Sequence, residues 1–402
     1  MALFAVIPTI GIASPYLALP ALTQAFGADG WASVAVGQSI GLAVSVPVEL
    51  GWGLVGPQRI AQAHTVRRRR RLVVWAIVSK SAVAVPLVLI AAVLGAISVV
   101  PYPMVTSLTA VATSSMGLTM TWYFIGADRP AMILLTDALP KLGGIIVAAW
   151  LLNSGAALWV YPLLGLMLPA LMGPLLTACH LRLGWSDLTG LTPRRVATVV
   201  YAQRAAVLGR TASALYISLP AAILSFVAPA AVPMFSAADR LMRMGLAVLQ
   251  AVPNAMQSWV GSRSVVTRRA RAHKAVWLNA VMGAVAGLIC AAVLPYASRL
   301  VFSGVATVSG DLAALAGGIA AVVCTSRATG GLALVAHQRV GAVALSASAG
   351  ALVGVPTVAI LGSLFGAFGG LLGVLAAELT VLGVQLLALV RVSRAASGGA
   401  AA

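Results

Sequence analysis

The sequence alternates long apolar stretches with short segments rich in arginine. Twelve of these stretches are long and apolar enough to cross a membrane as helices, because the hydrocarbon core of a bilayer needs about 20 mostly apolar residues. We therefore predict an all-α integral membrane protein with about twelve transmembrane helices. The predicted spans run roughly over residues 2–26, 31–57, 72–95, 98–122, 132–153, 156–180, 205–229, 233–259, 275–298, 311–336, 340–365 and 368–391.

The composition supports this prediction. Of the 402 residues, 61% are hydrophobic and 8% are charged, which is too little charge for the surface of a soluble protein. The net charge of +18 does not indicate nucleic acid binding, because the basic residues are not interleaved with aromatic residues on a soluble surface. Cys179, Cys290 and Cys324 lie far apart in apolar stretches, without the spacing of a metal site. We expect contact with membrane lipids, and no nucleic acid partner, metal or cofactor.

The basic residues between the spans predict the orientation in the membrane. Loops that face the cytoplasm carry an excess of Lys and Arg. With both termini in the cytoplasm, the cluster Arg67–Arg71, Arg195 and Arg269 lie inside, and only Arg299 lies in an external loop. The sequence therefore predicts a multi-pass protein of the cytoplasmic membrane with both termini in the cytoplasm.

The longest loop, over residues 180–204, contains the Gly, Asp, Thr and Pro residues of a connector. It divides the chain into two predicted lobes of six helices, 1–190 and 191–402. The loop around Arg129 in the first lobe recurs around Arg339 in the second at a similar offset. Duplicated transporter halves would produce this correspondence, although short basic loops between spans also resemble one another without duplication.

Ionisable residues inside the spans are candidates for function, because a charge at bilayer depth costs several kcal/mol unless it is paired or hydrated. Asp137 and Lys141 are four residues apart on one face of a helix, so we expect a structural ion pair. Arg327 and Glu378 lie near the middle of two spans, where a structural ion pair is also expected and a functional role is the alternative.

Lys80 and Arg210 lie within about two turns of the predicted cytoplasmic boundaries. Long side chains at this depth can extend to the lipid headgroups. We expect this arrangement for both residues, with a functional role as the alternative.

The eighth predicted span carries a polar stripe. Its polar residues recur at steps of three, four and seven, which places them on one face of a helix. Such a face must meet water or other polar helices, because lipid would leave its groups without hydrogen bonds. Gln38, Ser45 and Glu49 form a second, less cationic stripe on the second span, so we expect both stripes to face a shared central cavity. A buried polar seam between helices is the alternative. The first stripe consists of Ser236, Arg240, Arg243, Gln250, Asn254 and Gln257, with the carboxylate of Asp239 four residues before Arg243.

Three stretches of the sequence carry a resemblance to a known family. They are PYLALPALTQAFGADGWASVAVGQSIG followed by ELGWGLVGPQRIA, then TWYFIGADRP at Thr121–Pro130, and FSAADRLMRMGLAVLQAVPNAMQSWV at Phe235–Val260. In this order and spacing they resemble the polysaccharide flippases (O-antigen, Wzx-type) of the multidrug, oligosaccharidyl-lipid and polysaccharide (MOP) exporter superfamily. The sequence departs from the family pattern after Tyr16 and Leu17, where it carries no arginine.

The resemblance implies two pseudo-symmetric six-helix lobes around a central cavity. It also implies alternating-access transport of an undecaprenyl-diphosphate-linked oligosaccharide for polysaccharide biosynthesis, with a polysaccharide polymerase or glycosyltransferases as partners. Arginine suits the diphosphate because its planar fork meets two oxygens at once. The implied substrate-binding residues are Arg240 and Arg243 for the diphosphate, Gln250, Asn254 and Gln257 for sugar hydroxyls, and Glu49 and Gln38 from the second span, with Glu49 or Asp239 as the site of ion coupling.

Other functions stay open from the residues alone. A multidrug cation antiporter of the same superfamily requires an acidic cavity, whereas the stripe on the eighth span is net basic. A polytopic membrane enzyme of cell-envelope glycan assembly is a further alternative, but the predicted external loops are too short to build an active site. The sequence lacks a GxxxxGK[ST] loop for ATP, so we expect a transporter driven by a gradient, not an enzyme.

Overall fold

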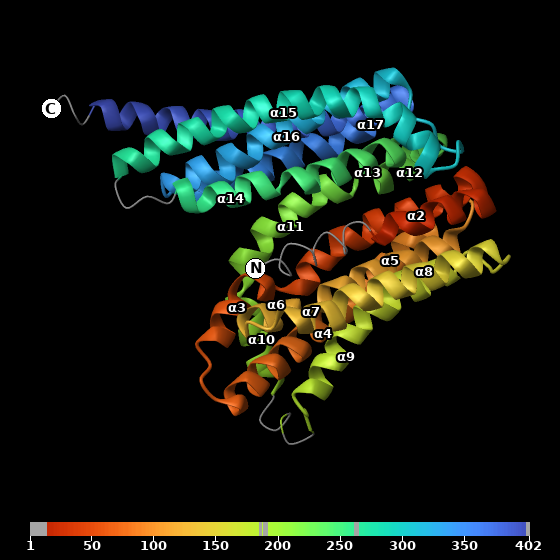
Figure 1. The fold of residues 1–402 in the computed structure, drawn as a ribbon, viewed down its shortest axis with the longest axis horizontal. Helices are drawn as coiled ribbons and strands as arrows, with labels where there is room; N and C mark the ends of the chain where they lie inside the picture. Colours follow the sequence, from red (N-terminus) through yellow and green to blue (C-terminus); the bar gives the residue numbers. More distant parts are fainter. Residues whose placement is uncertain (1–13, 185–186, 188–191, 261–264, 399–402) are drawn as a thin grey trace. The chain divides into compact units, whose positions relative to one another are not determined.

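The computed structural model describes residues 14–184, 187, 192–260 and 265–398, and all regular structure in these ranges is helical (Figure 1). Helices occupy all twelve predicted positions, although the first span is described only from residue 14 onward. Within the described ranges, seven helical segments are long and apolar enough to cross a membrane, and the bent pair Arg210–Ser218 and Pro220–Val227 makes an eighth.

Two of these segments cover more than one predicted span: Leu19–Ala61 contains the end of the first span and the whole second span, and Gly341–Val392 covers the eleventh and twelfth. The predicted fourth span is divided after Ser114, and the eighth carries three charged residues, so neither meets the same criterion alone. The prediction of an all-α membrane protein is therefore confirmed.

The chain forms two compact units, Met1–Ala214 and Leu215–Ala402. This division falls inside the helix Arg204–Ser218, whose start packs on the first unit, and the predicted lobes 1–190 and 191–402 stay a prediction. The elements of unit 1 are η1 (Ser14–Ala18), α2 (Leu19–Glu49), α3 (Trp52–Ala61), α4 (Val66–Ile97), α5 (Pro103–Ser114), η2 (Ser115–Leu118), α6 (Thr121–Gly126), α7 (Pro130–Ile133), η3 (Leu134–Ala138), α8 (Leu139–Asn153), η4 (Tyr161–Met167), α9 (Leu168–His180), α10 (Pro193–Ala202) and most of α11 (Arg204–Ser218).

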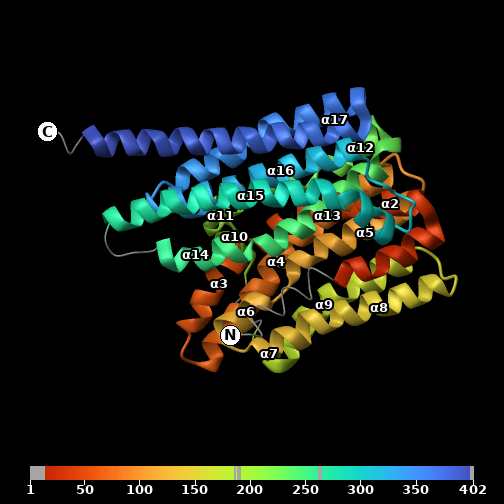
Figure 2. The same cartoon turned by 45° about the horizontal axis from the view of Figure 1, so that its top comes forward.

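Helices α2 and α5 pack closely in unit 1, side by side in Figures 1 and 2. Gly37 and Gly41 of α2 face Thr109 and Thr113 of α5 in the same order, so the two helices run parallel. Neither glycine leaves room for a Cβ, and a close approach of this kind stabilises helix pairs in lipid through van der Waals contact.

A buried aromatic cluster closes one end of unit 1. Trp52 of α3 and Trp122 of α6 lie with ring centroids 5.2 Å apart. Val199 and Val200 of α10 and Val207 of α11 pack against the same core, which attaches the connector to unit 1.

Unit 2 contains two tightly packed helix pairs. Helices α15 and α16 run side by side in both views (Figures 1 and 2) and meet at Gly287 and Gly317, each of which lies against the backbone carbonyl of the other. The elements of this unit are the end of α11, α12 (Pro220–Val227), η6 (Pro229–Ala231), α13 (Val232–Leu249), α14 (Ala251–Val260), α15 (Val265–Val301), α16 (Gly310–Ala328), η7 (Thr329–Leu334) and α17 (Val340–Gly398).

Helix α17 reverses direction at Gly366. This residue has φ 58° and ψ −131°, which is a conformation that glycine adopts without steric cost. After the reversal, Gly373 lies against Val358, and Ala377 lies against Gly354, so the two halves pack antiparallel. One residue therefore joins the predicted eleventh and twelfth spans.

The two turns that we compared in the sequence have the same geometry. Asp128 has φ 51°, and the Arg129 N–H donates to the Phe124 carbonyl at 2.9 Å. Gln338 has φ 60°, and the Arg339 N–H donates to the Leu334 carbonyl at 2.8 Å. The equivalent turns support the predicted correspondence between the two halves.

Candidate functional site

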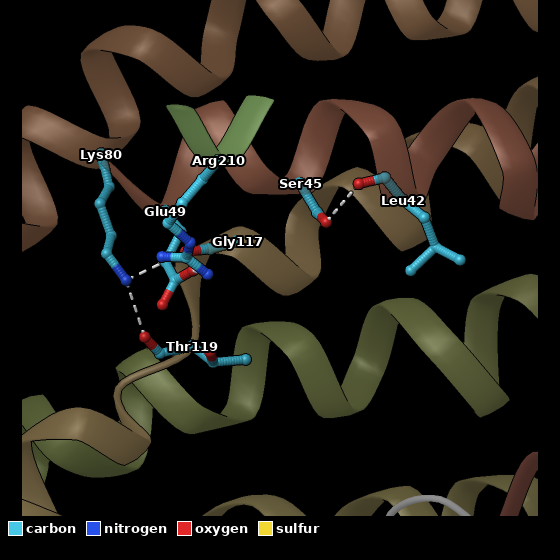
Figure 3. Close-up of polar contacts among 7 residues, drawn as sticks. All are labelled: Leu42, Ser45, Glu49, Lys80, Gly117, Thr119 and Arg210. Carbon is cyan, nitrogen blue, oxygen red and sulfur yellow. Dashed lines mark hydrogen bonds and ion pairs between the residues drawn. The ribbon is translucent and has the colours of Figure 1, made fainter. Parts of the chain in front are cut away.

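A charge cluster lies in unit 1 at the level where two of its helices break (Figure 3). Glu49, the last residue of α2, pairs with Arg210 of α11 at 2.7 Å between Oε2 and Nη2. The side chain of Glu49 is 24% exposed and that of Arg210 37% exposed, so the pair is only partly buried within unit 1. Lys80 of α4 lies within electrostatic range of both. We call Glu49, Lys80 and Arg210 the unit 1 charge cluster.

Lys80 does not extend to the headgroups as we expected. Its side chain is fully buried, and its Nζ donates to the Gly117 carbonyl at 3.0 Å and to the Thr119 carbonyl at 2.9 Å. These carbonyls are available because the regular helix stops at η2 and resumes at α6. An ammonium group held by two carbonyls beside a carboxylate avoids much of the cost of burial, which accounts for its position deep in the unit.

The backbone also breaks beside Glu49. Leu50 has φ 55° and Gly51 φ 71°, and the Leu50 N–H donates to the Pro47 carbonyl at 3.2 Å. This left-handed turn ends α2 and directs the chain into α3. The guanidinium group of Arg210 is paired with the carboxylate at this turn, and its expected extension to the headgroups stays a prediction. The sequence did not reveal the pairing, since residues 49 and 210 lie in predicted spans two and seven.

Arg243 occupies a polar seam within unit 2. Its Nε donates to both carboxylate oxygens of Asp239 at 2.9 and 2.7 Å, and its Nη2 donates to the Ile217 carbonyl at 3.0 Å. The spacing of four residues places Asp239 and Arg243 on one face of the helix, where their charges balance. This geometry agrees with the alternative expectation, in which Arg243 lies in a polar seam between helices. The side chain of Arg243 is 30% exposed.

Arg327 and Glu378 lie near this seam but do not form an ion pair with each other. The Nη1 of Arg327 donates to the Leu246 carbonyl of α13 at 2.9 Å. Glu378 is buried, within electrostatic range of Arg243 and Arg327. The expected direct ion pair between Arg327 and Glu378 is therefore absent. The guanidinium group of Arg327 instead donates to a backbone carbonyl, and Glu378 interacts with both arginines at longer range. We call Asp239, Arg243, Arg327 and Glu378 the unit 2 charge cluster.

The polar stripe on the eighth span is divided at Gln250, where α13 ends before α14 begins. The side-chain amide of Gln250 donates through Nε2 to the side-chain oxygen Oδ1 of Asn254 at 3.1 Å, and Asn254 is exposed. Arg240 is partly buried in α13. Gln257 lies in α14, but its side chain falls outside the described part of the chain.

The stripe on the second span is also partly engaged within its own unit. Gln38 is buried, and its amide nitrogen lies 3.2 Å from the Tyr161 hydroxyl of η4. Ser45 donates to the Leu42 carbonyl of its own helix at 2.8 Å (Figure 3). Glu49 is thus the member of this stripe that joins a charge cluster, and the shared cavity of the two stripes stays a prediction.

The ion pair expected between Asp137 and Lys141 is present at 2.8 Å. It lies where the π-helical turn η3 passes into α8 and contributes no net charge. Among the residues that the structure describes, no three His, Cys, Asp or Glu side chains are grouped as metal ligands would be.

The two charge clusters differ in net charge. Among the described intramembrane residues, the unit 1 cluster has two cations and one carboxylate, and the unit 2 cluster has two arginines and two carboxylates. The unit 1 cluster therefore carries one positive charge in excess at a depth where charge is costly, whereas the charges of the unit 2 cluster balance. Such groups can bind and release an anion, but they include no nucleophile with an adjacent general base.

Comparisons with known proteins place this arrangement in a known fold. No protein-family model matches the sequence, and no curated protein matches it. An inward-facing multidrug resistance MATE family transporter of the MOP superfamily is similar over 96% of this chain and 95% of its own, with a TM-score of 0.69 and 14% identity. The lipid II flippase MurJ, in an inward closed conformation, is similar over 97% of this chain and 87% of its own, with a TM-score of 0.69 and 10% identity. The eukaryotic MATE transporter AtDTX14 is similar over 95% of this chain and 93% of its own chain, with a TM-score of 0.61 and 13% identity.

The chain therefore shares the all-helical fold of these structures, which is compatible with the predicted two lobes. Because the sequence identities are only 10 to 14%, the similarities concern the fold alone. The similar structures are named as transporters or flippases, and their fold agrees with the multi-pass character of this chain.

Proposed function

We propose that the protein exports an anionic lipid-linked oligosaccharide, of the undecaprenyl-diphosphate class, across the cytoplasmic membrane for polysaccharide biosynthesis. The observation that carries this proposal is the excess of positive charge in the unit 1 charge cluster. A diphosphate that leaves the hydrated headgroup region needs compensating charge in the protein. Arg240, one of the two arginines of the predicted stripe on the eighth span, is the candidate for phosphate contact.

The proposed mechanism is alternating access without bond chemistry. The polar head of the substrate crosses through the protein while its lipid tail stays in the bilayer. A diphosphate with about two negative charges gains roughly 4–5 kcal/mol per 100 mV when it moves outward across an inside-negative membrane. The membrane potential can therefore contribute to export, with Glu49 or Asp239 as the candidate site of any ion coupling. A polysaccharide polymerase or glycosyltransferases would act before or after this step.

The names of the similar structures support two substrate classes. MurJ is named as a lipid II flippase, whereas the MATE proteins are named as multidrug transporters. The second candidate is therefore a multidrug cation antiporter, which would use the carboxylates of Asp239 and Glu378. The sign of the unit 1 charge cluster favours the first, because a net positive site repels an organic cation.

Transport by the purified protein in liposomes tests the proposal. The lipid-linked oligosaccharide is incorporated during reconstitution, and the fraction reached by a membrane-impermeant glycosidase is followed over time, with and without a membrane potential. Arg240→Gln should lower the flipping rate about 10- to 100-fold, because a hydrogen bond to a charged group is worth roughly 1.5–3 kcal/mol. Arg240→Lys should retain part of the rate, since the charge survives while the planar fork is lost.

A matched control removes one positive and one negative charge together, so that the net charge does not change. The double change Asp239→Asn with Arg243→Gln deletes one charge of each sign and should reduce the rate less than Arg240→Gln. Flipping by Arg240→Gln at the parent rate would refute the phosphate contact. Failure of the parent protein to flip the lipid, together with uptake of ethidium against a proton gradient, would establish the antiporter instead.

A further inference from the structure

An apolar cavity of about 920 Å³ lies within unit 1 beside the connector helix α10. Its walls come from three parts of the chain that are distant in sequence, and they expose few polar atoms. This volume lies in the range of about 300–1,000 Å³ that is typical of small-ligand pockets. The wall residues used here are Pro47 and Leu50 at the end of α2, Val78 and Val83 of α4, and Val196 and Val200 of α10.

Helix α10 separates apolar from basic side chains. Val199 and Val200 pack toward the core of unit 1, whereas Arg194, Arg195 and Thr198 are exposed. A short helix with one apolar and one basic face typically lies in the membrane interface, where its cations meet anionic headgroups. This position places the cavity at the height of the lipid headgroups and the first part of their chains.

Arg204 supplies a cation at the cavity itself. It is exposed, lines the cavity, and has its guanidinium carbon 3.9 Å from the centre of the Tyr201 ring. Tyr201 lines the same cavity and is 64% exposed. Tyrosine and arginine together at the edge of an apolar cavity match the boundary between phosphate and acyl chain, because each side chain has an apolar part and a polar tip.

We propose that this cavity binds an acyl chain of an anionic phospholipid from the cytoplasmic leaflet, with the phosphate at Arg204. The apolar walls exclude a polar solute, and the basic edge favours an anionic headgroup over a zwitterionic one. The occupant is a membrane lipid and not the transported substrate, so the proposal does not depend on the function proposed above.

The cavity adjoins the unit 1 charge cluster along the chain. Leu50 follows Glu49, Val207 lies one turn before Arg210, and Lys80 stands between two wall residues of α4. A bound acyl chain would hold α10 and the start of α11 against α4. It would thereby support the helix that carries Arg210 to Glu49.

Photochemical labelling tests the site in the intact protein. The full chain is placed in phosphatidylcholine nanodiscs that contain a small fraction of phosphatidylglycerol with a diazirine on one acyl chain, and labelled peptides are mapped after illumination. Label should concentrate on Val78 and Val83 relative to Leu89 and Val93, which are exposed positions of the same helix. Arg204→Gln should lower the preference for the phosphatidylglycerol probe over its phosphatidylcholine analogue about tenfold, the loss expected from one charge-assisted hydrogen bond.

Two tryptophan variants of α4 form a matched pair. Ala82 lines the cavity, whereas Val85 is exposed and does not line it. Ala82→Trp should fill the cavity and bring its labelling down to the level of Leu89, whereas Val85→Trp should leave it unchanged. The milder Ala82→Leu should give an intermediate loss, which separates filling of the cavity from misfolding.

Three results would overturn the proposal. Equal labelling of Val83 and Leu89 in the parent protein would mean that the cavity holds no particular lipid. Equal labelling by the phosphatidylglycerol and phosphatidylcholine probes would remove the role of Arg204. Displacement of the label by an undecaprenyl-diphosphate lipid, and not by unlabelled phosphatidylglycerol, would assign the cavity to the tail of the substrate.

Discussion

Replacement of Lys80 by methionine tests whether the buried ammonium group holds unit 1 together. Methionine keeps a similar length and volume, so the change removes mainly the charge and its two hydrogen bonds. The carbonyls of Gly117 and Thr119 then lose their donor in a fully buried place. Each unsatisfied carbonyl costs about 1–3 kcal/mol.

The loss is partly offset, because the variant no longer buries a charge, which itself costs several kcal/mol. We expect a net destabilisation of about 2 kcal/mol, which corresponds to about 4–8 °C for a unit of this size. The measurement is the apparent melting temperature in detergent. Samples are heated, and the protein that stays folded is quantified by size-exclusion chromatography with tryptophan fluorescence detection.

Lys141→Met is the matched control. Lys141 is also an intramembrane lysine, but its side chain is 20% exposed and its partner Asp137 lies four residues away on the same helix. The control should cost about 0.5 kcal/mol or less, as pairs at this spacing do. If Lys80→Met melts at the same temperature as Lys141→Met, the role assigned to the two carbonyl contacts is wrong.

Two further predictions concern the reversal in α17 and the orientation of the chain. Gly366→Ala should cost about 1–3 kcal/mol through its backbone conformation of φ 58° and ψ −131° alone, because the nearest atom to an added Cβ is 3.6 Å away. Gly318→Ala, where no atom lies within 4 Å and the helix is regular, should be neutral or stabilising in the same melting assay. A cysteine at position 195 should resist an impermeant maleimide in intact cells while one at 299 reacts, and strong labelling at 195 would overturn the predicted orientation.

Much of the fold followed from the apolar pattern. Twelve apolar stretches of bilayer length predicted the twelve helical regions, because hydrophobic length is the main constraint on a membrane helix. The pattern could not show that one glycine joins the last two spans, since the turn at Gly366 depends on a single φ angle. It also could not place the boundary of unit 1 inside α11, which follows from the packing of Val199, Val200 and Val207.

The candidate site was predicted less completely. Spacing along one helix gave the pairs of Asp137 with Lys141 and of Asp239 with Arg243, because neighbours at four residues are fixed by helix geometry. The contact between Glu49 and Arg210 joins distant spans, and no local pattern encodes it. The break between η2 and α6 likewise created the carbonyl site for Lys80. The signal for this site in the sequence is the rarity of lysine inside a span, together with a glutamate in the preceding span.

The reversal at Gly366 has a consequence for biosynthesis. As one straight helix, the 59 residues of α17 would reach about 90 Å, roughly three times the thickness of the hydrocarbon core. The turn leaves no polar loop between the two spans. Such a loop could stay in water after the eleventh span has inserted and before the twelfth span is made. The eleventh and twelfth spans therefore enter the bilayer as one hairpin, and a ribosome that stalls between them would present half of a packing unit to the quality-control proteases of the membrane.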